Sequence, residues 1–593
     1  MGGNNLKIRQ KYLRTINRIS FWISLFSVLV LVFDVGFRHD PVTEDYLENF
    51  YMLALLMGTL SIGIRYYYSS ERFAWKVRIF DGIIISLYLL VTAVLSDRLL
   101  RKLEFLEFFN NMGWVYLAVV VYFMREFSTL RINYDRQLLN PAQLFILSFL
   151  SMIMLATFLL MLPKATHSGI SLLDALFTAT SAVCVTGLIV VDTGSYFTQF
   201  GQVIILVFIQ LGGLGIMTFA SYFSYFFRGK TSFENQIMLK DMTNSEKISE
   251  VFGVLKKIIG ITFLLEFIGT IGIFMTITSA EMKRIGSEIF FSIFHSISAF
   301  CNAGFSTLTN SLYEAEFQFN YPLQLIITFL FILGGIGFPI LFNLYRYFLY
   351  RTRNQFMKIS KPYKYEYVPW VININTRIVL LTTLILLSGG TLLFFWFEYD
   401  STLAGHSLFG KVVTSFFGAA TPRTAGFNSV DMGELTFPTV MITMLLMWIG
   451  ASPGSTGGGI KTSTFAVATL NFLSLARGKD RVEVFRRQIS NLSVRRAFAI
   501  ISLSLLVIGM AICFIAVFDG QLTLFNIAFE CFSAYSTVGL SLGITDDLSG
   551  PSKFVIIAVM FIGRVSMLTI LIAFLRRVKH QNYRFPKEEI LMT

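Results

Sequence analysis

An eight-residue phrase of small and hydroxyl side chains, closed by a glycine and one large apolar residue, occurs four times in this chain. The copies occupy residues 181–188, 298–305, 420–427 and 533–540. Their closing glycines stand 117, 122 and 113 residues apart, and such a near-constant period indicates a repeat architecture. Each copy follows an apolar stretch of about three helical turns and is flanked by two longer apolar runs. The sequence therefore predicts four units of helix, half-helix with loop, and helix, arranged around one axis.

The composition is typical of an integral membrane protein. Hydrophobic residues make up 54% of the 593 residues and charged residues only 14%. The net charge of +13 resides in short links between apolar runs, so we expect contact with membrane lipid and no nucleic acid. The four cysteines form no CxxC or Cys/His spacing, so we expect neither a disulfide framework nor a zinc site. We expect no covalent cofactor. A cleavable signal peptide is not expected either, because the basic run 7–18 leads into a span long enough to cross the membrane.

Four apolar runs precede the first repeat and predict an accessory N-terminal bundle of about four helices at residues 1–138. Asp81 inside one run, and Arg98 with Arg101 at the end of that run, raise the alternative of a voltage sensor. A gating helix needs several arginines at every third place, so packing or dimer support is favoured. The predicted pore repeats occupy residues 139–230, 231–352, 353–490 and 491–593, the third carrying a gate loop and the fourth ending in a cytosolic tail.

Basic links alternate with the apolar runs and determine the predicted orientation. Lys and Arg gather in the links that follow each predicted inner helix, and basic links stay in the cytoplasm. Both termini are therefore predicted to be cytoplasmic, and the four phrases to open outward. Within the repeats, residues 211–215 and 333–337 share a Leu-Gly-Gly-x-Gly patch in the first two inner helices, which supports duplication.

Non-helical backbone at membrane depth is stable only where it is buried within the protein or lines a water-filled cavity. Carbonyl oxygens turned toward one axis can replace the hydration shell of a monovalent cation, and the negative ends of the half-helices favour a cation there. A single small-residue phrase would suit a helix-packing patch, but four copies in register favour a filter. The candidate filter residues are Val185, Thr186, Gly187, Asn302, Ala303, Gly304, Thr424, Ala425, Gly426, Thr537, Val538 and Gly539.

The third inner helix is interrupted by the glycine-rich residues 450–459. Each interior glycine costs about 1 kcal/mol and an interior proline about 3 kcal/mol, so the stretch predicts a loop just below the filter. It is not a phosphate loop, because Ile460 separates Gly459 from Lys461. Arg564 stands level with this loop in an otherwise apolar run, where a charge is costly unless it is paired or faces water. A salt bridge with Glu266 is one way to pair it.

Residues 174–188, the Ala-Gly-Phe phrases and residues 454–462 resemble the Trk/Ktr/HKT superfamily of cation transporters, closest to the bacterial TrkH and KtrB subunits. The resemblance covers about residues 142–575. It implies an all-α polytopic membrane protein with four membrane helix–pore helix–membrane helix repeats in a pseudo-fourfold pore. The extra N-terminal helices depart from the simplest family plan.

The resemblance also implies potassium uptake across the cell (inner) membrane, a homodimer, and a cytosolic ring of nucleotide-binding RCK-type (TrkA/KtrA-like) regulatory subunits. In that family a glycine at the position of Gly187 goes with potassium permeation, and a serine goes with sodium preference in some plant members. Potassium is therefore the expected transported ion. The alternative is a sodium or mixed sodium/potassium transporter of the same fold.

The same resemblance implies that the glycine-rich stretch is an intramembrane gate and that Arg564 guards it. Lys461 lines the inner vestibule or is an interfacial lysine, and Arg423 is expected at the outer mouth. The candidate gate residues are Gly454, Ser455, Thr456, Gly457, Gly458, Gly459, Lys461 and Arg564.

Two competing functions predict other patterns. An alternating-access carrier shows two inverted halves rather than four direct repeats. A membrane enzyme needs clustered acids, histidines or serines at one membrane face, and the sequence carries no such cluster. We therefore expect a transporter and no enzyme.

Overall fold

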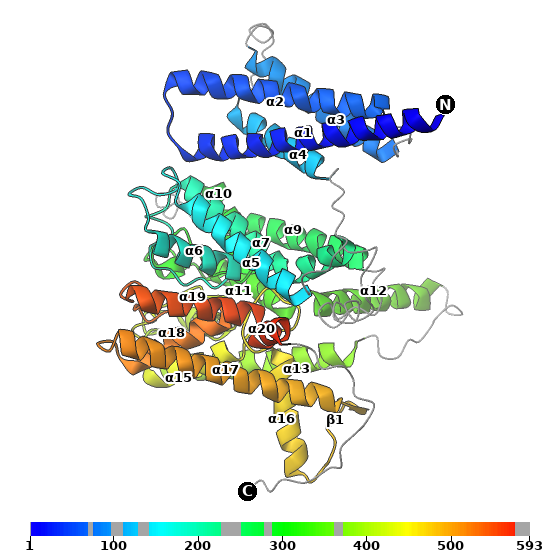
Figure 1. Cartoon of the computed structure of the whole chain (residues 1–593). Coiled ribbons are helices and arrows are strands. Elements are labelled where there is room, and N and C mark those ends of the chain that lie inside the picture. Colours follow the sequence, from blue (N-terminus) through cyan, green and yellow to red (C-terminus); the bar gives the residue numbers. More distant parts are fainter. Residues whose placement is uncertain are drawn as a thin grey trace. The chain divides into compact units, whose positions relative to one another are not determined.

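The computed structural model describes residues 2–68, 75–96, 111–128, 141–226, 251–277, 287–360 and 372–575. These residues hold nineteen α-helices, a 3-10 turn at Ser311–Tyr313, and a hairpin of β1 (Glu483–Val484) and β2 (Arg487–Gln488) (Figure 1). Seven of the helices in these ranges are long and apolar enough to cross a membrane, or up to nine spans if each of two bent pairs is counted as one. The chain forms two compact units, Met1–Gln137 with Leu162–Gly169, and Leu138–Met161 with Ile170–Thr593.

The first unit is a bundle of α1 (Gly2–Gly36), α2 (Pro41–Tyr68), α3 (Trp75–Leu95) and α4 (Met112–Phe127). Helix α1 packs against both α2 and α4, and α2 packs against α3. Tyr51, Tyr88 and Tyr122 are fully buried at its centre.

Buried charges in this bundle are held by partners. Arg65 donates to Glu126, and Arg125 donates to Asp81 through Nε at 2.6 Å and Nη2 at 2.9 Å. Separating a buried pair leaves an uncompensated charge, which costs several kcal/mol, so these contacts suit a packed bundle better than a charge-moving sensor. Arg98 and Arg101 lie outside the described residues.

The second unit contains four repeats of the predicted kind. Their helices are α5 (Pro141–Leu160), α6 (Leu172–Cys184) and α7 (Gln199–Phe226); α9 (Val251–Thr276), α10 (Glu288–Phe300), α11 (Tyr321–Ile336) and α12 (Phe338–Ser360); α13 (Ile374–Glu398), α14 (Leu408–Ala420), α15 (Phe437–Trp448) and α16 (Thr462–Ala476); and α17 (Asn491–Phe518), α18 (Leu524–Ser536), α19 (Gly550–Val565) and α20 (Met567–Phe574).

The short helix of each repeat packs against the inner helix of the repeat before it. Helix α10 packs on α7, α14 on α11, α18 on α15, and α6 on α19. Because the last contact joins the first repeat to the fourth, the order closes on itself. The four repeats therefore surround one axis.

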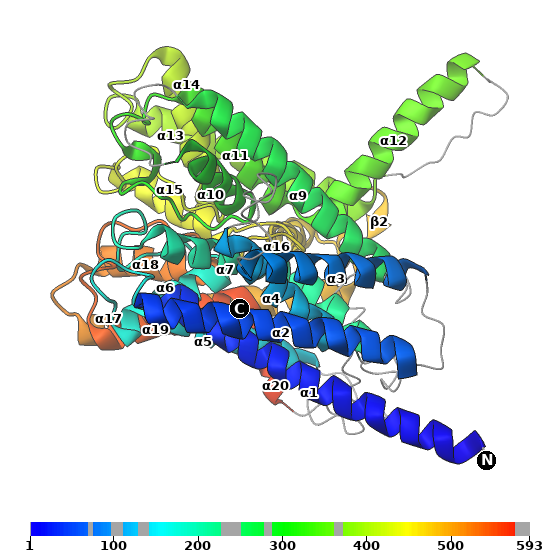
Figure 2. The same cartoon turned by 90° about the horizontal axis from the view of Figure 1, so that it is seen from above.

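Two inner helices that the sequence predicts as continuous are broken. The chain bends by 100° between α11 and α12 at Gly337, and by 85° between α19 and α20 at Ser566. Gly337 has φ +94°, and the next amide, that of Phe338, donates to the carbonyl of Gly454 at 3.0 Å instead of continuing the helix. Ser566 has φ +75°. Figure 2 shows the result, with α12 directed away from α9 and α11.

Candidate functional site

The four short helices begin in the same way. Each is thirteen residues long and is preceded by a hydroxyl residue, Ser171, Ser287, Ser407 or Thr523, whose side chain accepts a hydrogen bond from the backbone N–H three residues later. Such N-caps fix where a helix starts. Equal starts and equal lengths bring the four C-terminal ends, with their partial negative charge, to equivalent places in the ring.

A hydroxyl at the first or second position of each phrase hydrogen-bonds to the backbone of the loop that follows. Ser181 Oγ accepts from the Gly187 amide at 3.0 Å, and Ser533 Oγ accepts from the Gly539 amide at 3.2 Å. In the second repeat, Ser298 Oγ donates to the Phe305 carbonyl at 2.7 Å. The third phrase begins with alanine, and there the hydroxyl of Thr421, one residue later, donates to the Phe427 carbonyl at 2.8 Å.

The backbone of the four loops repeats an uncommon conformation. Val185, Asn302, Thr424 and Thr537 have φ between +51° and +79°, and the closing glycines two residues later have φ between +70° and +95°. Positive φ is a steric outlier for β-branched residues such as valine and threonine. Strained backbone at four matching positions is typical of a functional site whose surroundings hold it in place.

The closing glycines form a ring. A Cβ added to Gly187 would lie closer than 3.0 Å to the carbonyl oxygen of Ala303, and one added to Gly304 would overlap that of Ala425 in the same way. A Cβ added to Gly426 would likewise overlap the carbonyl oxygen of Val538, and one added to Gly539 would overlap that of Thr186. Each loop thus presents a main-chain oxygen to the glycine of its neighbour, and the fourth loop closes on the first.

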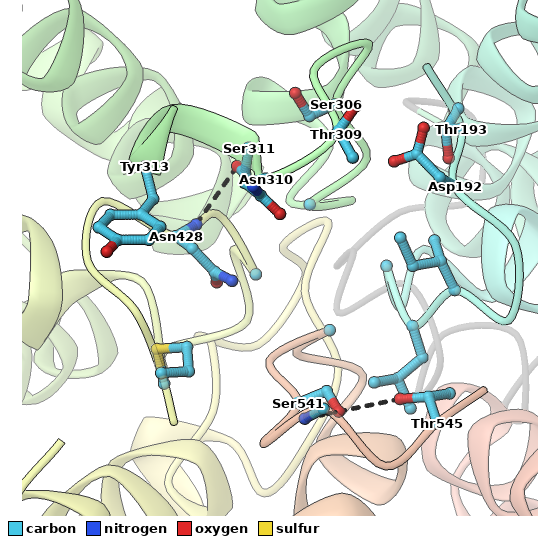
Figure 3. A pocket seen from close by; sticks show the side chains of 18 of the residues that line it. Asp192, Thr193, Ser306, Thr309, Asn310, Ser311, Tyr313, Asn428, Ser541 and Thr545 are labelled. Carbon is cyan, nitrogen blue, oxygen red and sulfur yellow. Dashed lines mark hydrogen bonds between the residues drawn. The ribbon is translucent and has the colours of Figure 1, made fainter. Parts of the chain in front are cut away.

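A cavity of about 500 Å³ lies directly against these four glycines (Figure 3). The segments following all four phrases line it, and its carboxylates come from Asp192, Asp431 and Asp546. Burial, with Asp431 and Glu434 nearby, raises the pKa of Tyr313 in its wall. The mouth of the ring is therefore acidic, which favours the approach of cations.

The glycine-rich segment between α15 and α16 lies against the other side of the loops. A Cβ added to Gly457 would overlap the hydroxyl of Thr424, and one added to Gly458 would overlap that of Thr537. The Ser452 amide donates to the Gly335 carbonyl of α11 at 2.9 Å. The predicted loop directly behind the four phrases is thus present, and residues without Cβ atoms allow its close approach.

Arg564 of α19 holds this segment in place. Its guanidinium donates to the carbonyl of Thr456 and, at 2.6 Å, to the carbonyl of Gly212 in α7. The predicted alternative partner, Glu266, instead accepts from Gln210 Nε2 at 3.3 Å. Arg564 therefore pairs with main-chain oxygens, and the proposed salt bridge with Glu266 is wrong.

Lys461 turns back on its own loop. Its Nζ donates to the carbonyls of Gly457 at 2.6 Å and Gly458 at 3.2 Å. Two cations, Lys461 and Arg564, thus bind oxygens of the segment that lies just behind the loops. Positive charge at this place would repel a cation that approached through the ring.

One expected position is wrong, and some contacts were not foreseen. Arg423, expected at the outer mouth, is 8% exposed and points toward Thr383 of α13, with Nη2 3.5 Å from the hydroxyl. The glycine patches of α7 and α11 lie where side chains would collide with the phrases, since a Cβ on Gly212 or Gly334 would overlap the carbonyl of Val183 or Phe300. Their repetition was visible in the sequence, but their contacts were not.

The chain matches the family model described as "TrkH: Cation transport protein" over residues 109–584. It is 37% identical over 453 residues to "Ktr system potassium uptake protein B" of Bacillus subtilis, covering 76% of this chain and 96% of the relative. It is 35% identical over 470 residues to "Potassium/sodium uptake protein NtpJ" of Enterococcus hirae, covering 77% and 98%.

The fold also matches a solved structure. The potassium transporter TrkH from Vibrio parahaemolyticus superposes with a TM-score of 0.59 at 16% identity, over 95% of this chain and 98% of that one. This likeness confirms the predicted all-α polytopic fold. The family match and these relatives together show that the chain is an integral membrane transporter, not an enzyme, and that it belongs to the TrkH family of cation transport proteins.

Proposed function

We propose that the chain is a channel-like potassium-uptake subunit whose four loops form the selectivity filter. The observation that carries the proposal is the closed ring in which the oxygens of Ala303, Ala425, Val538 and Thr186 each lie against the closing glycine of the preceding loop. Such a ring of carbonyl oxygens can replace the hydration shell of a dehydrated cation. The names of two relatives, which specify potassium or potassium/sodium uptake, support the choice of ion.

The filter residues in this proposal are the twelve that the sequence predicts. All four closing positions are glycines, which favours potassium by the family pattern. Sodium or mixed transport by the same fold is the second candidate, because one relative is named for both ions. No resident cofactor is part of this proposal; potassium is the cargo.

The gate in this proposal is the segment Gly454, Ser455, Thr456, Gly457, Gly458 and Gly459, with Lys461 and Arg564. The segment's hydrogen bonds to α11 and to Arg564 of α19, whose guanidinium also binds a carbonyl of α7, support a closed arrangement in which two cations stand behind the filter. Ion passage then requires the segment to withdraw, and glycines make such a movement inexpensive.

The remaining assignments rest on the family pattern and on charge. Relatives named as parts of a "Ktr system" support a separate regulatory subunit, which we assign to a cytosolic RCK-type ring, and we assign the transporter itself to a homodimer. Basic links support cytoplasmic termini and a filter that opens outward. Residues 1–138 serve as an accessory bundle.

The test is ion flux into liposomes that contain the purified full chain. We expect rubidium uptake above that of empty liposomes, competition by external potassium, and weaker competition by sodium. Reversal potentials under mixed potassium and sodium gradients then separate the two candidates. Flux of neither ion, with and without a regulatory ring, would contradict the proposed function.

A further inference from the structure

Asn302 stands at the start of the second loop, at the position occupied by Val185, Thr424 and Thr537 in the other three. It is fully buried and has φ +60°. Asparagine tolerates this left-handed conformation better than β-branched residues do. It also brings to this position a side chain with a donor and an acceptor.

Both ends of the Asn302 amide are occupied. Nδ2 donates to the hydroxyl of Thr424 in the third loop at 3.2 Å. Oδ1 accepts from the hydroxyl of Thr456 in the glycine-rich segment at 3.0 Å. One side chain therefore joins two filter loops to the candidate gate.

The surroundings leave the amide little freedom. A Cβ on Gly334 would come within 2.6 Å of Asn302 Oδ1, and one on Gly335 within 3.5 Å of Nδ2, so α11 closes off one side. Thr456 is held there as well, because its amide donates to the Gly334 carbonyl at 3.4 Å and its hydroxyl lies 3.2 Å from the Phe300 carbonyl. The gate segment and Asn302 thus dock on the same pair of glycines.

The corresponding side chains in other loops lack such a link. Val185 has no polar atom, and the Thr537 hydroxyl has no hydrogen-bond partner within the part of the chain that the structure describes. The segment packs against Thr537 of the fourth loop as well, but the described hydrogen bonds that join it to side chains at this loop position run through Asn302 of the second loop and Thr424 of the third.

We propose that Asn302 is a positioning residue that couples the gate segment to the selectivity filter, so that ion preference depends on where the segment lies. When Thr456 withdraws, Asn302 Oδ1 loses the hydrogen bond that it accepts from the Thr456 hydroxyl. The Asn302 side chain is then freer to move, and its hydrogen bond to Thr424 weakens. Both residues lie two positions before closing glycines of the ring, so Gly304 and Gly426 shift with them. A looser ring discriminates less well against sodium, which coordinates at shorter distances. This inference rests on the proposed function.

Two isosteric changes test it in the full chain. Thr456→Val removes the hydroxyl that reaches Asn302 but keeps the carbonyl that binds Arg564, and Thr424→Val removes the other partner while keeping a β-branched side chain. Thr462→Val is the matched control, because the Thr462 hydroxyl bonds Ser452 and not Asn302. The readout is the ratio of sodium to rubidium uptake in liposomes, which does not depend on how much protein is active.

Each of the first two changes should raise the sodium-to-rubidium ratio about fivefold, the size expected for one buried hydrogen bond. The double variant should show no more than the larger single effect, because both bonds act through Asn302. Thr462→Val should keep the wild-type ratio. Wild-type ratios in both single variants, or effects that multiply in the double variant, overturn the coupling while leaving the proposed function intact. Absence of rubidium uptake by the wild-type chain overturns the proposed function itself, and the coupling with it.

Discussion

Replacing Arg564 with alanine tests whether the glycine-rich segment is a closed gate. The guanidinium donates to the carbonyls of Thr456 and Gly212, and a hydrogen bond from a charged donor contributes about 1.5–3 kcal/mol. Only the bond to Thr456 reaches the segment, so its loss removes about 1.5–3 kcal/mol of support from the closed arrangement, which changes a closed-to-open ratio by roughly 12- to 150-fold. Water recovers part of this, so we expect a roughly tenfold rise in rubidium uptake.

The assay is rubidium uptake into liposomes containing the full chain without a regulatory ring, per amount of folded protein. Arg564→Lys keeps the charge, but one ammonium cannot reproduce the planar fork, so an intermediate rise is expected. Lys553→Ala is the control on the same helix, since Lys553 donates to Asp174 at 2.9 Å and does not reach the segment. Uptake by Arg564→Ala equal to that of the wild type would refute the reasoning.

Three further predictions follow, two measured by rubidium uptake in the same liposomes and one by thermal melting in detergent. Gly539→Ala should lower rubidium uptake at least tenfold, because the added Cβ would overlap the Thr186 carbonyl. Gly543→Ala is the control: Gly543 has a similar φ but faces open space, so this variant should retain most of the uptake. Equal losses of uptake in the two variants would contradict the ring of glycines and carbonyl oxygens. Deleting two glycines from residues 457–459 should raise uptake as Arg564→Ala does, and unchanged uptake in both variants removes the gate assignment. Burial alone would raise the pKa of Asp519, but hydrogen bonds from Ser552 and Ser549 outweigh it and lower that pKa. A carboxylate whose pKa is lowered by folding stabilises the fold at pH values above its unfolded pKa of about 3.9, and this stabilisation is lost as the pH falls through the lower, folded pKa. Asp519→Asn should therefore lower the melting temperature in detergent at pH 7, and the difference from the wild type should shrink as the pH falls below about 3.9.

The repeated parts of the fold could be predicted because they depend on local signals. A hydroxyl cap, an amphipathic three-turn helix and a closing glycine recur at a fixed period, so the four short helices are expected close to where the structure has them. The broken third inner helix was likewise visible, since Gly and Pro are costly inside a helix. In each case the sequence within one repeat is enough.

Features that depend on another repeat could not be predicted. The bend at Gly337 arises where the Phe338 amide finds the Gly454 carbonyl, and that partner belongs to the third repeat. The bend at Ser566 has no proline or adjacent glycine to announce it. Arg423 follows Pro422 in a phrase whose closing glycine lines the cavity, yet its side chain turns toward α13, an orientation that only the packed structure reveals.

A pore that closes on itself within a single polypeptide differs from one assembled out of identical subunits. In a symmetric tetramer every substitution appears in all quadrants at once. Here Val185, Asn302, Thr424 and Thr537 occupy corresponding places with three different side chains, and within the described ranges the glycine-rich segment belongs to the third repeat alone. Point changes can therefore be introduced one quadrant at a time, and the contribution of each to conduction can be measured separately in an otherwise intact protein.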